Sequence, residues 1–289
     1  MSASGPATEG ILAPAKINLN LKIVGRREDG YHLLDSMVVF TAFGDRILVQ
    51  PSPQDSITID GPFGGMLNEP PSENICAKAL TMFRLAGGRV GPLAIHIRKD
   101  IPVGAGLGGG SSNAAALLRW LQENADGAVP DVSLSEIAPS LGADVPACLA
   151  GRALQMTGIG ETITLMSTAP HGRILLASPR VFMPTKTIFT ALAQSDFAIG
   201  EGANAVSQSS AGSVAELVAR GNDLQPVAIE QAPIIGDLVQ QIETQTGCVA
   251  AQMTGSGSAC FGIFETAERS DAAAALLAGH GFWTVSTRF

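Results

Sequence analysis

Ile101-Pro-Val-Gly-Ala-Gly-Leu-Gly-Gly-Gly-Ser-Ser-Asn113 is the most informative stretch of this 289-residue sequence. Five of the seven residues 104–110 are glycine, and strong helix formers follow from Ala114 to Leu121. Upstream, residues 93–98 alternate apolar and polar side chains, as a half-buried strand does. The sequence therefore predicts a strand, then a glycine loop, then the N-terminus of a helix.

This predicted arrangement favours an anion site. Glycine lets the backbone adopt positive φ and approach a ligand closely, and the first amides of a helix have no intrahelical acceptor. The helix dipole adds about half a positive charge there, so phosphate groups are the expected ligands. Glycine-rich turns also occur without any ligand, and that alternative stays open for the loop alone.

Two common phosphate-binding signatures do not describe the loop. The P-loop of the large NTPase class requires a lysine after its glycines, and none follows here. Gly104, Gly106 and Gly109 have the spacing of a dinucleotide fingerprint, which also needs an acidic strand end about twenty residues later. Asp126 lies near that offset, but in a polar, glycine-containing stretch.

Composition and charge narrow the class of protein. Hydrophobic residues make up 46% and charged residues 15%, which is typical of a globular chain, here expected to form two domains around a cleft. The net charge of −8 argues against binding to nucleic acid or an anionic membrane. No apolar run reaches the roughly 20 residues of a membrane span, and residues 1–15 lack Lys and Arg, so neither an anchor nor a secretory signal is expected.

The four cysteines are scattered and have no Cys-x-x-Cys pair. We therefore expect reduced, small apolar residues in a cytoplasmic protein, rather than a disulfide framework or a zinc site. They are Cys76, Cys148, Cys248 and Cys260.

Lys16 and Asn18 stand out near the N-terminus, because they cluster beside Pro14 on the polar face of a strand predicted over residues 11–24. Such a polar face suits a charged substrate, although a solvated surface has the same pattern. A charged turn at 25–30 leads to Tyr31-His32 and to strands expected at 33–40, 45–50 and 56–60. An amphipathic helix is predicted over residues 75–85, where Asn74 is a candidate helix cap.

Several of these motifs together resemble one family. Pro-x-Gly-x-Gly-Leu-Gly-x-Gly-Ser-Ser is similar to the central ATP loop of the GHMP small-molecule kinases, which include galactokinase, homoserine kinase and mevalonate kinase. Ala-Pro-Ala-Lys-Ile-Asn-Leu at 13–19 and Asp-Gly-Tyr-His-x-Leu at 29–34 are similar to the opening of one GHMP branch, which phosphorylates a cytidine diphosphate ester of methylerythritol. Matching segments at 142–146, 183–189 and 251–264 extend the resemblance over nearly the whole chain.

The resemblance implies an α+β, two-domain GHMP kinase fold. Its N-terminal domain would be like ribosomal protein S5 and its C-terminal domain ferredoxin-like α/β, with the active site in the cleft between them. We place the ATP-binding domain at residues 1–155, with the glycine loop at 102–112, and the C-terminal domain at 156–289.

The resemblance also implies an activity: ATP-dependent phosphorylation of the 2-hydroxyl of the cytidylated methylerythritol, in the non-mevalonate isoprenoid pathway. Asp144 would accept the proton of the hydroxyl and Lys16 would be its partner. The ATP-binding residues would be Pro102, Val103, Gly104, Ala105, Gly106, Leu107, Gly108, Gly109, Gly110, Ser111 and Ser112, with Asn74 and Lys99 near the base and ribose. The residues expected on the substrate are Asn18, Tyr31, His32, Thr185 and Phe189.

Other features are expected with less detail. Two sets of facing phosphates require Mg²⁺, whose protein ligands stay undetermined, with Ser112 and Asn113 as candidates. Lys186, Gln225 and Asn113 depart from the family pattern, with an Asp in some relatives at the position of Asn113. The segment around Gln225 is expected to be mainly structural. We expect the protein to bind a small-molecule substrate and neither nucleic acid nor a membrane. We also expect it to be a monomer or a homodimer. The alternatives are another GHMP kinase, acting on homoserine, mevalonate or a sugar, and a catalytically inactive nucleotide-binding regulator.

Overall fold

One long strand, β3 (His32–Pro51), runs through the first of two sheets in the computed structural model, which describes residues 10–67, 70–125, 134–195 and 213–289. The beginning of β3 pairs with β2 and β6, and its later part with β1 and β5. All these pairs are antiparallel, whereas β4 pairs with β5 in parallel. The remaining strands of this sheet are β1 (Ile11–Asn18), β2 (Lys22–Arg26), β4 (Ser56–Asp60), β5 (Leu93–Arg98), β6 (Leu154–Gly158) and β7 (Thr162–Leu165).

The strand pattern near the N-terminus differs from the sequence-based expectation. Residues 33–40 and 45–50 belong to one strand, because Gly44 is not a turn residue: a Cβ there would lie 2.1 Å from the carbonyl oxygen of Ala13 on β1. The single strand expected over 11–24 is divided into β1 and β2. Between them, the Asn20 side chain accepts a hydrogen bond from the Met37 amide, in place of a regular backbone partner.

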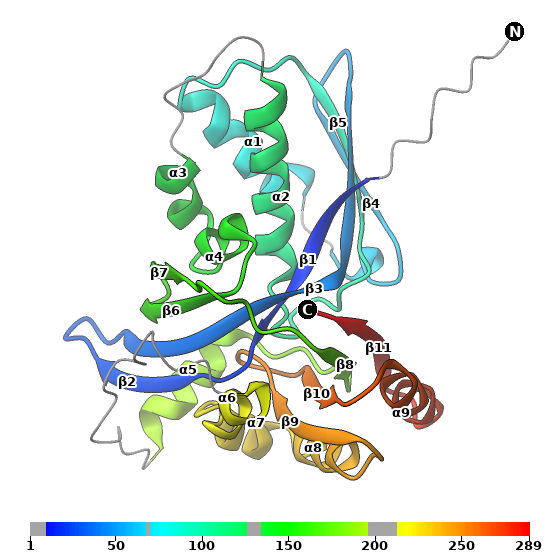
Figure 1. Cartoon of the computed structure of the whole chain (residues 1–289). Helices are drawn as coiled ribbons and strands as arrows, with labels where there is room; N and C mark the ends of the chain where they lie inside the picture. The colour runs from blue at the N-terminus through cyan, green and yellow to red at the C-terminus, as the bar shows by residue number, and fades with distance from the viewer. Residues whose placement is uncertain (1–9, 68–69, 126–133, 196–212) are drawn as a thin grey trace, which may run out of the picture.

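Helices cover the outer face of this sheet. They are α1 (Ile75–Leu85), α2 (Gly109–Asn124), α3 (Leu134–Leu141) and α4 (Val145–Ala150). Helix α2 packs on β1 and also contacts α1 and α4, so its first turn is anchored in the interior (Figure 1). The bounds of α1 and β5 agree with the sequence-based prediction, and α2 follows the glycine loop as expected.

The second sheet has the strand order β11-β8-β10-β9 and is antiparallel throughout. Numbered within this half, that order is 4-1-3-2, and with its crossing helices it is the ferredoxin-like arrangement expected. The strands are β8 (Arg173–Ser178), β9 (Cys248–Met253), β10 (Cys260–Phe264) and β11 (Trp283–Arg288), and the helices are α5 (Thr185–Gln194), α6 (Val214–Ala219), α7 (Gln225–Gln231), α8 (Ile234–Glu243) and α9 (Ala267–Gly279).

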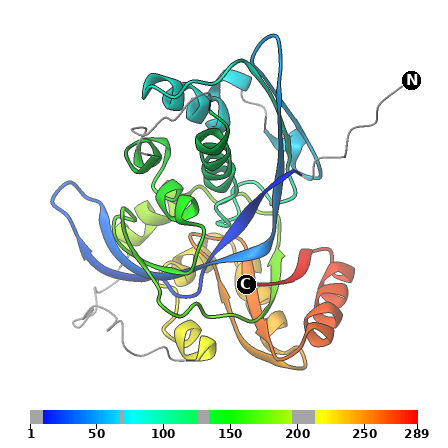
Figure 2. The same ribbon diagram turned by 45° about the horizontal axis from the view of Figure 1, so that its top comes forward.

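The two sheets pack against each other, with helices on the outside (Figures 1 and 2). Strand β8 is buried on both of its faces. Ile174 and Leu176 join the core formed with β1 and β3, whereas Leu175 and Ala177 pack on the side of the C-terminal helices. A strand buried on both faces carries a continuous apolar run, as this one does. The mixed α+β, two-part fold is therefore confirmed.

The division predicted between residues 155 and 156 falls within β6 and stays a prediction. The four cysteines are free, as expected. Burial raises the pKa of the Cys76 and Cys148 thiols to about 12, so both are inert, neutral side chains at pH 7.

Candidate active site

A cleft of about 960 Å³ lies between the two halves of the molecule. Its walls come from β1, the β2–β3 turn and the start of α4 on one side, and from α5 and the loop after β9 on the other. The residues predicted to act in catalysis or on the substrate all line it: Lys16, Asn18, Tyr31, His32, Asp144, Thr185 and Phe189.

Lys16 and Asp144 form an ion pair across 128 residues of sequence. Lys16 Nζ lies 2.5 Å from Asp144 Oδ1, and the lysine side chain is only 4% exposed, whereas that of Asp144 is 38% exposed. Asp144 is the N-cap residue of α4 but makes no capping bond with its side chain. One carboxylate oxygen therefore holds the lysine, and the other is available toward the cleft.

The glycine loop has the conformation that its composition predicts. Gly104, Gly106 and Gly108 have φ of 68°, 77° and 65°, in the left-handed region, and Gly108 is the N-cap residue of α2. The loop also lies next to Lys16, whose backbone amide donates to the carbonyl oxygen of Leu107 at 2.9 Å. The anion cradle and the ion pair are thus adjacent.

Two other segments hold the loop from outside. Ala259 donates its backbone amide to the Ala105 carbonyl at 3.0 Å, and Met183 donates to that of Gly104 at 3.3 Å. A Cβ at Gly106 would lie 2.7 Å from the carbonyl oxygen of Thr254, so the second glycine loop, residues 254–258, packs directly against the first. With its carbonyl groups bound outward, the first loop is pre-formed, as an anion site requires.

Replacement of Gly108 by alanine is expected to weaken ATP binding about 5- to 30-fold. A left-handed alanine costs about 1–2 kcal/mol, and its Cβ would lie 3.1 Å from Lys16 Cβ, so the loop must shift. Calorimetric titration with ATP measures the effect. Gly281→Ala is the matched control, because Gly281 also has positive φ, at 91°, with open space around it. Equal ATP affinity in both variants would contradict the prediction.

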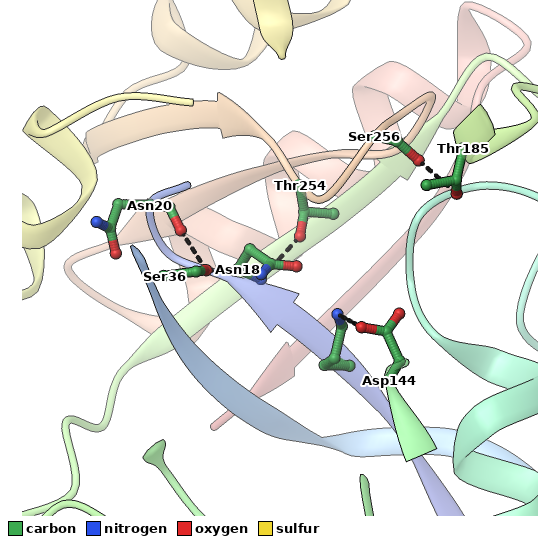
Figure 3. A network of polar contacts seen from close by, with 8 residues as sticks. Asn18, Asn20, Ser36, Asp144, Thr185, Thr254 and Ser256 are labelled. Carbon is green, nitrogen blue, oxygen red and sulfur yellow. Dashed lines mark hydrogen bonds and ion pairs between the residues drawn. The ribbon is translucent and has the colours of Figure 1, made fainter. Parts of the chain in front are cut away.

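Asn18 is held by a chain of buried hydrogen bonds (Figure 3). Its backbone amide donates to Thr254 Oγ1 at 2.9 Å, and its side-chain Nδ2 donates to Ser36 Oγ at 2.7 Å. The side-chain oxygen, Oδ1, is buried and has no partner in the described structure. A buried polar atom without a partner is uncommon in a folded protein and indicates a place for a ligand atom here.

Aromatic side chains also line the cleft. The rings of His32 and Phe189 lie 5.5 Å apart at 33°, whereas Tyr31 is 61% exposed. His32 rather than Tyr31 is therefore the ring in contact with Phe189. Burial, and next the charge of Arg26, lower the pKa of His32, so its imidazole is neutral at pH 7. Thr185, at the start of α5, lies 3.0 Å from Ser256 Oγ of the second glycine loop (Figure 3).

The other predicted nucleotide contacts are less direct. Gly106 and Ser111 of the loop line the cleft. Asn74 caps α1, since its Oδ1 accepts from the Cys76 amide at 2.9 Å. Lys99 is buried and forms an ion pair with Asp45, which also accepts two backbone amides. Their contacts with a nucleotide stay predictions.

The residues that the structure describes contain no group of three or more His, Cys, Asp or Glu side chains suited to a metal. Two oxygens near the start of α2 are candidate ligands for a hard cation: Ser112 Oγ and Asn113 Oδ1 are buried and have no hydrogen-bond partner in the described structure. Mg²⁺ prefers such oxygen ligands and keeps several of its waters.

Sequence reasoning missed other residues of the site. Ser36 lies within an apolar strand, and no local pattern distinguishes it. Arg26 and Lys186 also line the cleft, although the sequence indicates Arg26 only as part of a charged turn and Lys186 only as a departure from the family pattern. Gln225 accepts from the Met253 amide at 2.8 Å, and Asn222 donates to the carbonyl groups of Met253 and Gly255, which agrees with a structural role for this segment.

Comparisons with known proteins identify the class of protein to which this chain belongs. Models of the GHMP kinases N-terminal domain and C-terminal domain match residues 74–152 and 203–280. A homoserine kinase from Cytophaga hutchinsonii has the same fold, with 15% identity and a TM-score of 0.62 over 100% of this chain and 96% of that one. Together with the cleft and its glycine loop, these matches define a small-molecule kinase of the GHMP class.

More similar relatives narrow this class. The 4-diphosphocytidyl-2-C-methyl-D-erythritol kinase of Paramagnetospirillum magneticum is 40% identical over 96% of both chains, and that of Chelativorans sp. is 40% identical over 95% of this chain and 93% of its own. A crystal structure of 4-(cytidine 5'-diphospho)-2C-methyl-D-erythritol kinase has 31% identity and a TM-score of 0.77 over 96% of this chain and 97% of that one. The chain belongs to the family of 4-diphosphocytidyl-2-C-methyl-D-erythritol kinases. Among the described residues, no helix has the length and apolar composition to cross a bilayer.

Proposed function

We propose that this protein transfers the γ-phosphoryl group of ATP to the 2-hydroxyl of 4-diphosphocytidyl-2-C-methyl-D-erythritol, giving the 2-phosphate and ADP in the non-mevalonate isoprenoid pathway. One observation carries the proposal: the Lys16–Asp144 ion pair lies beside a pre-formed glycine loop and in a cleft with aromatic side chains. The acceptor follows from the names of the relatives at 40% identity.

The reaction requires a group that takes up the proton of the substrate hydroxyl, and it requires that this hydroxyl be held in position toward the γ-phosphorus. Asp144 accepts the proton of the substrate 2-hydroxyl while the hydroxyl oxygen bonds to the γ-phosphorus. At the same time, the bond from that phosphorus to the β–γ bridging oxygen of ATP breaks. Lys16 holds the carboxylate and favours negative charge on the attacking oxygen. Lys16 is buried, and its backbone amide also bonds to the glycine loop. The site of the acceptor hydroxyl and the ATP site are therefore fixed relative to each other.

The phosphates of ATP would lie at the N-terminus of α2, where backbone amides lack intrahelical acceptors. We place Mg²⁺ beside them, where Ser112 Oγ and Asn113 Oδ1, both buried and without a hydrogen-bond partner, would be its candidate protein ligands. When bound, the ion would neutralise negative charge on the phosphates. The protein as a whole does not supply this positive charge, because its own net charge is −8.

The cytidine end of the substrate would lie at the opposite end of the cleft, against Phe189. Its diphosphate would then pass Lys186, one helical turn before Phe189 on α5. Lys186 lines the cleft and would supply a cation beside this diphosphate. Thr185 and Asn18 also line the cleft, and we place them beside the methylerythritol part of the substrate, between its diphosphate and Lys16.

A turnover assay with purified protein tests the function. We expect ADP release with ATP, Mg²⁺ and the cytidylated methylerythritol, and none above background with homoserine, mevalonate or galactose. Omission of Mg²⁺ with excess chelator is expected to abolish the reaction. Turnover of one of the other alcohols alone would favour a different GHMP kinase, and ATP binding without any turnover would favour a regulator. The free cysteines support a reducing compartment such as the cytoplasm, in which we place a monomer or homodimer.

A further inference from the structure

Ser36 is a buried hydroxyl that touches the site without lining the cleft. It is 0% exposed on β3, accepts from Asn18 Nδ2 at 2.7 Å and donates to the Asn20 carbonyl oxygen at 2.6 Å. Asn20 is fixed in turn, because its side-chain oxygen accepts from the Met37 amide at 2.8 Å. Ser36 thus has two partners that are themselves held by the sheet.

A hydroxyl has a single proton, and this fact determines the orientation of the Asn18 amide. Because the Ser36 proton lies toward the Asn20 carbonyl, Ser36 can only accept from Asn18. The Asn18 nitrogen must therefore face Ser36, and Oδ1 must face the other way, as Figure 3 shows. With the amide turned over, Ser36 would have to leave the buried Asn20 carbonyl to donate to Asn18, so only the observed orientation satisfies both groups.

We infer that Ser36 is a positioning residue that makes Asn18 present a hydrogen-bond acceptor to the substrate, so that this position selects a substrate group that can donate. The inference rests on the proposed function. Asn18 lines the cleft two residues after Lys16 on the same face of β1, so the group it meets lies close to the carbon that carries the reacting hydroxyl. In the proposed substrate, the donors beside that carbon are the C1 and C3 hydroxyls.

Orientation of the amide can be measured without any substrate. In NMR spectra of the ¹⁵N-labelled full chain, the Asn18 side-chain NH₂ pair, assigned by its loss in Asn18→Asp, is expected to exchange slowly with solvent in the wild type. In Ser36→Ala the exchange is expected to become at least about tenfold faster, because the amide loses its acceptor. Equal exchange in both proteins would overturn the inference, even if the protein phosphorylated a different alcohol.

Kinetics test the selection itself. In Ser36→Ala we expect KM for the cytidylated substrate to rise about tenfold, with KM for ATP unchanged. Analogues with fluorine in place of the C1 or C3 hydroxyl cannot donate, so one of them should be rejected by the wild type but much less by Ser36→Ala. Ser36→Thr keeps the hydroxyl and should restore the wild-type behaviour.

Ser270→Ala is the control for loss of a buried hydroxyl, because Ser270 is 0% exposed on α9 and its hydroxyl accepts from Ser286 Oγ at 2.8 Å. An unchanged KM for the cytidylated substrate in Ser36→Ala would overturn the inference. Equal rises in KM for this substrate and for ATP would overturn it too, because a general packing defect gives that result. Absence of wild-type turnover would instead refute the proposed function, and the exchange measurement would still decide the amide orientation.

Discussion

Asp144→Asn is expected to lower kcat by about 10²- to 10⁴-fold and to leave ATP affinity within twofold of the wild type. The amide cannot accept the proton of the substrate hydroxyl, but its oxygen still accepts from Lys16 Nζ, so the buried lysine keeps a partner. The glycine loop does not depend on Asp144, since its backbone bonds come from Lys16, Met183 and Ala259. Single-turnover kinetics and calorimetry with ATP separate the two effects.

Asp55→Asn is the control for this charge change. Asp55 forms a bidentate ion pair with Arg84, at 2.5 and 3.0 Å, and accepts the Leu93 amide at 2.9 Å, on a part of the surface that does not line the cleft. The same charge change at Asp55 therefore removes a bound carboxylate without touching the cleft. The kcat of Asp55→Asn is expected to equal that of the wild type. Near-normal turnover by a folded Asp144→Asn protein would remove Asp144 from the role of proton acceptor.

A substrate without the cytosine base is expected to be phosphorylated with a kcat/KM about two orders of magnitude lower. Stacking of a base on an aromatic ring contributes about 1–3 kcal/mol, and hydrogen-bonding groups left unpaired without the base add to the loss. Phe189 is in the cleft, in contact with His32, and Tyr31 is exposed beside them. Methylerythritol phosphate and its cytidylated form are compared in the same assay.

Phe189→Ala and Tyr31→Ala extend this comparison to the protein. Each is expected to raise KM for the cytidylated substrate about 5- to 150-fold and to leave KM for ATP nearly unchanged, because ATP lies beyond the transferred phosphoryl group. For the substrate without a base, neither variant should differ from the wild type. Equal use of both substrates, or a defect confined to ATP, would favour a generic small-molecule kinase.

Much of the local structure was predictable from sequence, because it depends on neighbours within a few residues. The bounds of α1 and β5 follow from apolar periodicity and from the residues that flank each run. The glycine loop and the start of α2 follow from the same reasoning, since only glycine adopts the positive φ of Gly104, Gly106 and Gly108 without strain. The motifs around these elements were specific enough to indicate the family.

Tertiary packing decided what the local pattern left open. The expected break within β3 is absent, because the close approach of β1 requires Gly44 in an extended strand rather than in a turn. Likewise, Ser36 looks like any small residue in an apolar strand until β1 and the second glycine loop bring Asn18 against it. Local propensity carries no information on such contacts, because they form only when distant elements pack.

The same distinction applies to the site. Sequence alone determined which chemical groups the protein has: a glycine loop, a lysine, a carboxylate and aromatic residues in recognisable motifs. Only the tertiary structure decided that Lys16 and Asp144, 128 residues apart, form an ion pair, and that His32 is the ring against Phe189. The physical reason is that hydrogen bonds and ion pairs act over a few ångströms, and the packing of the two sheets sets those distances.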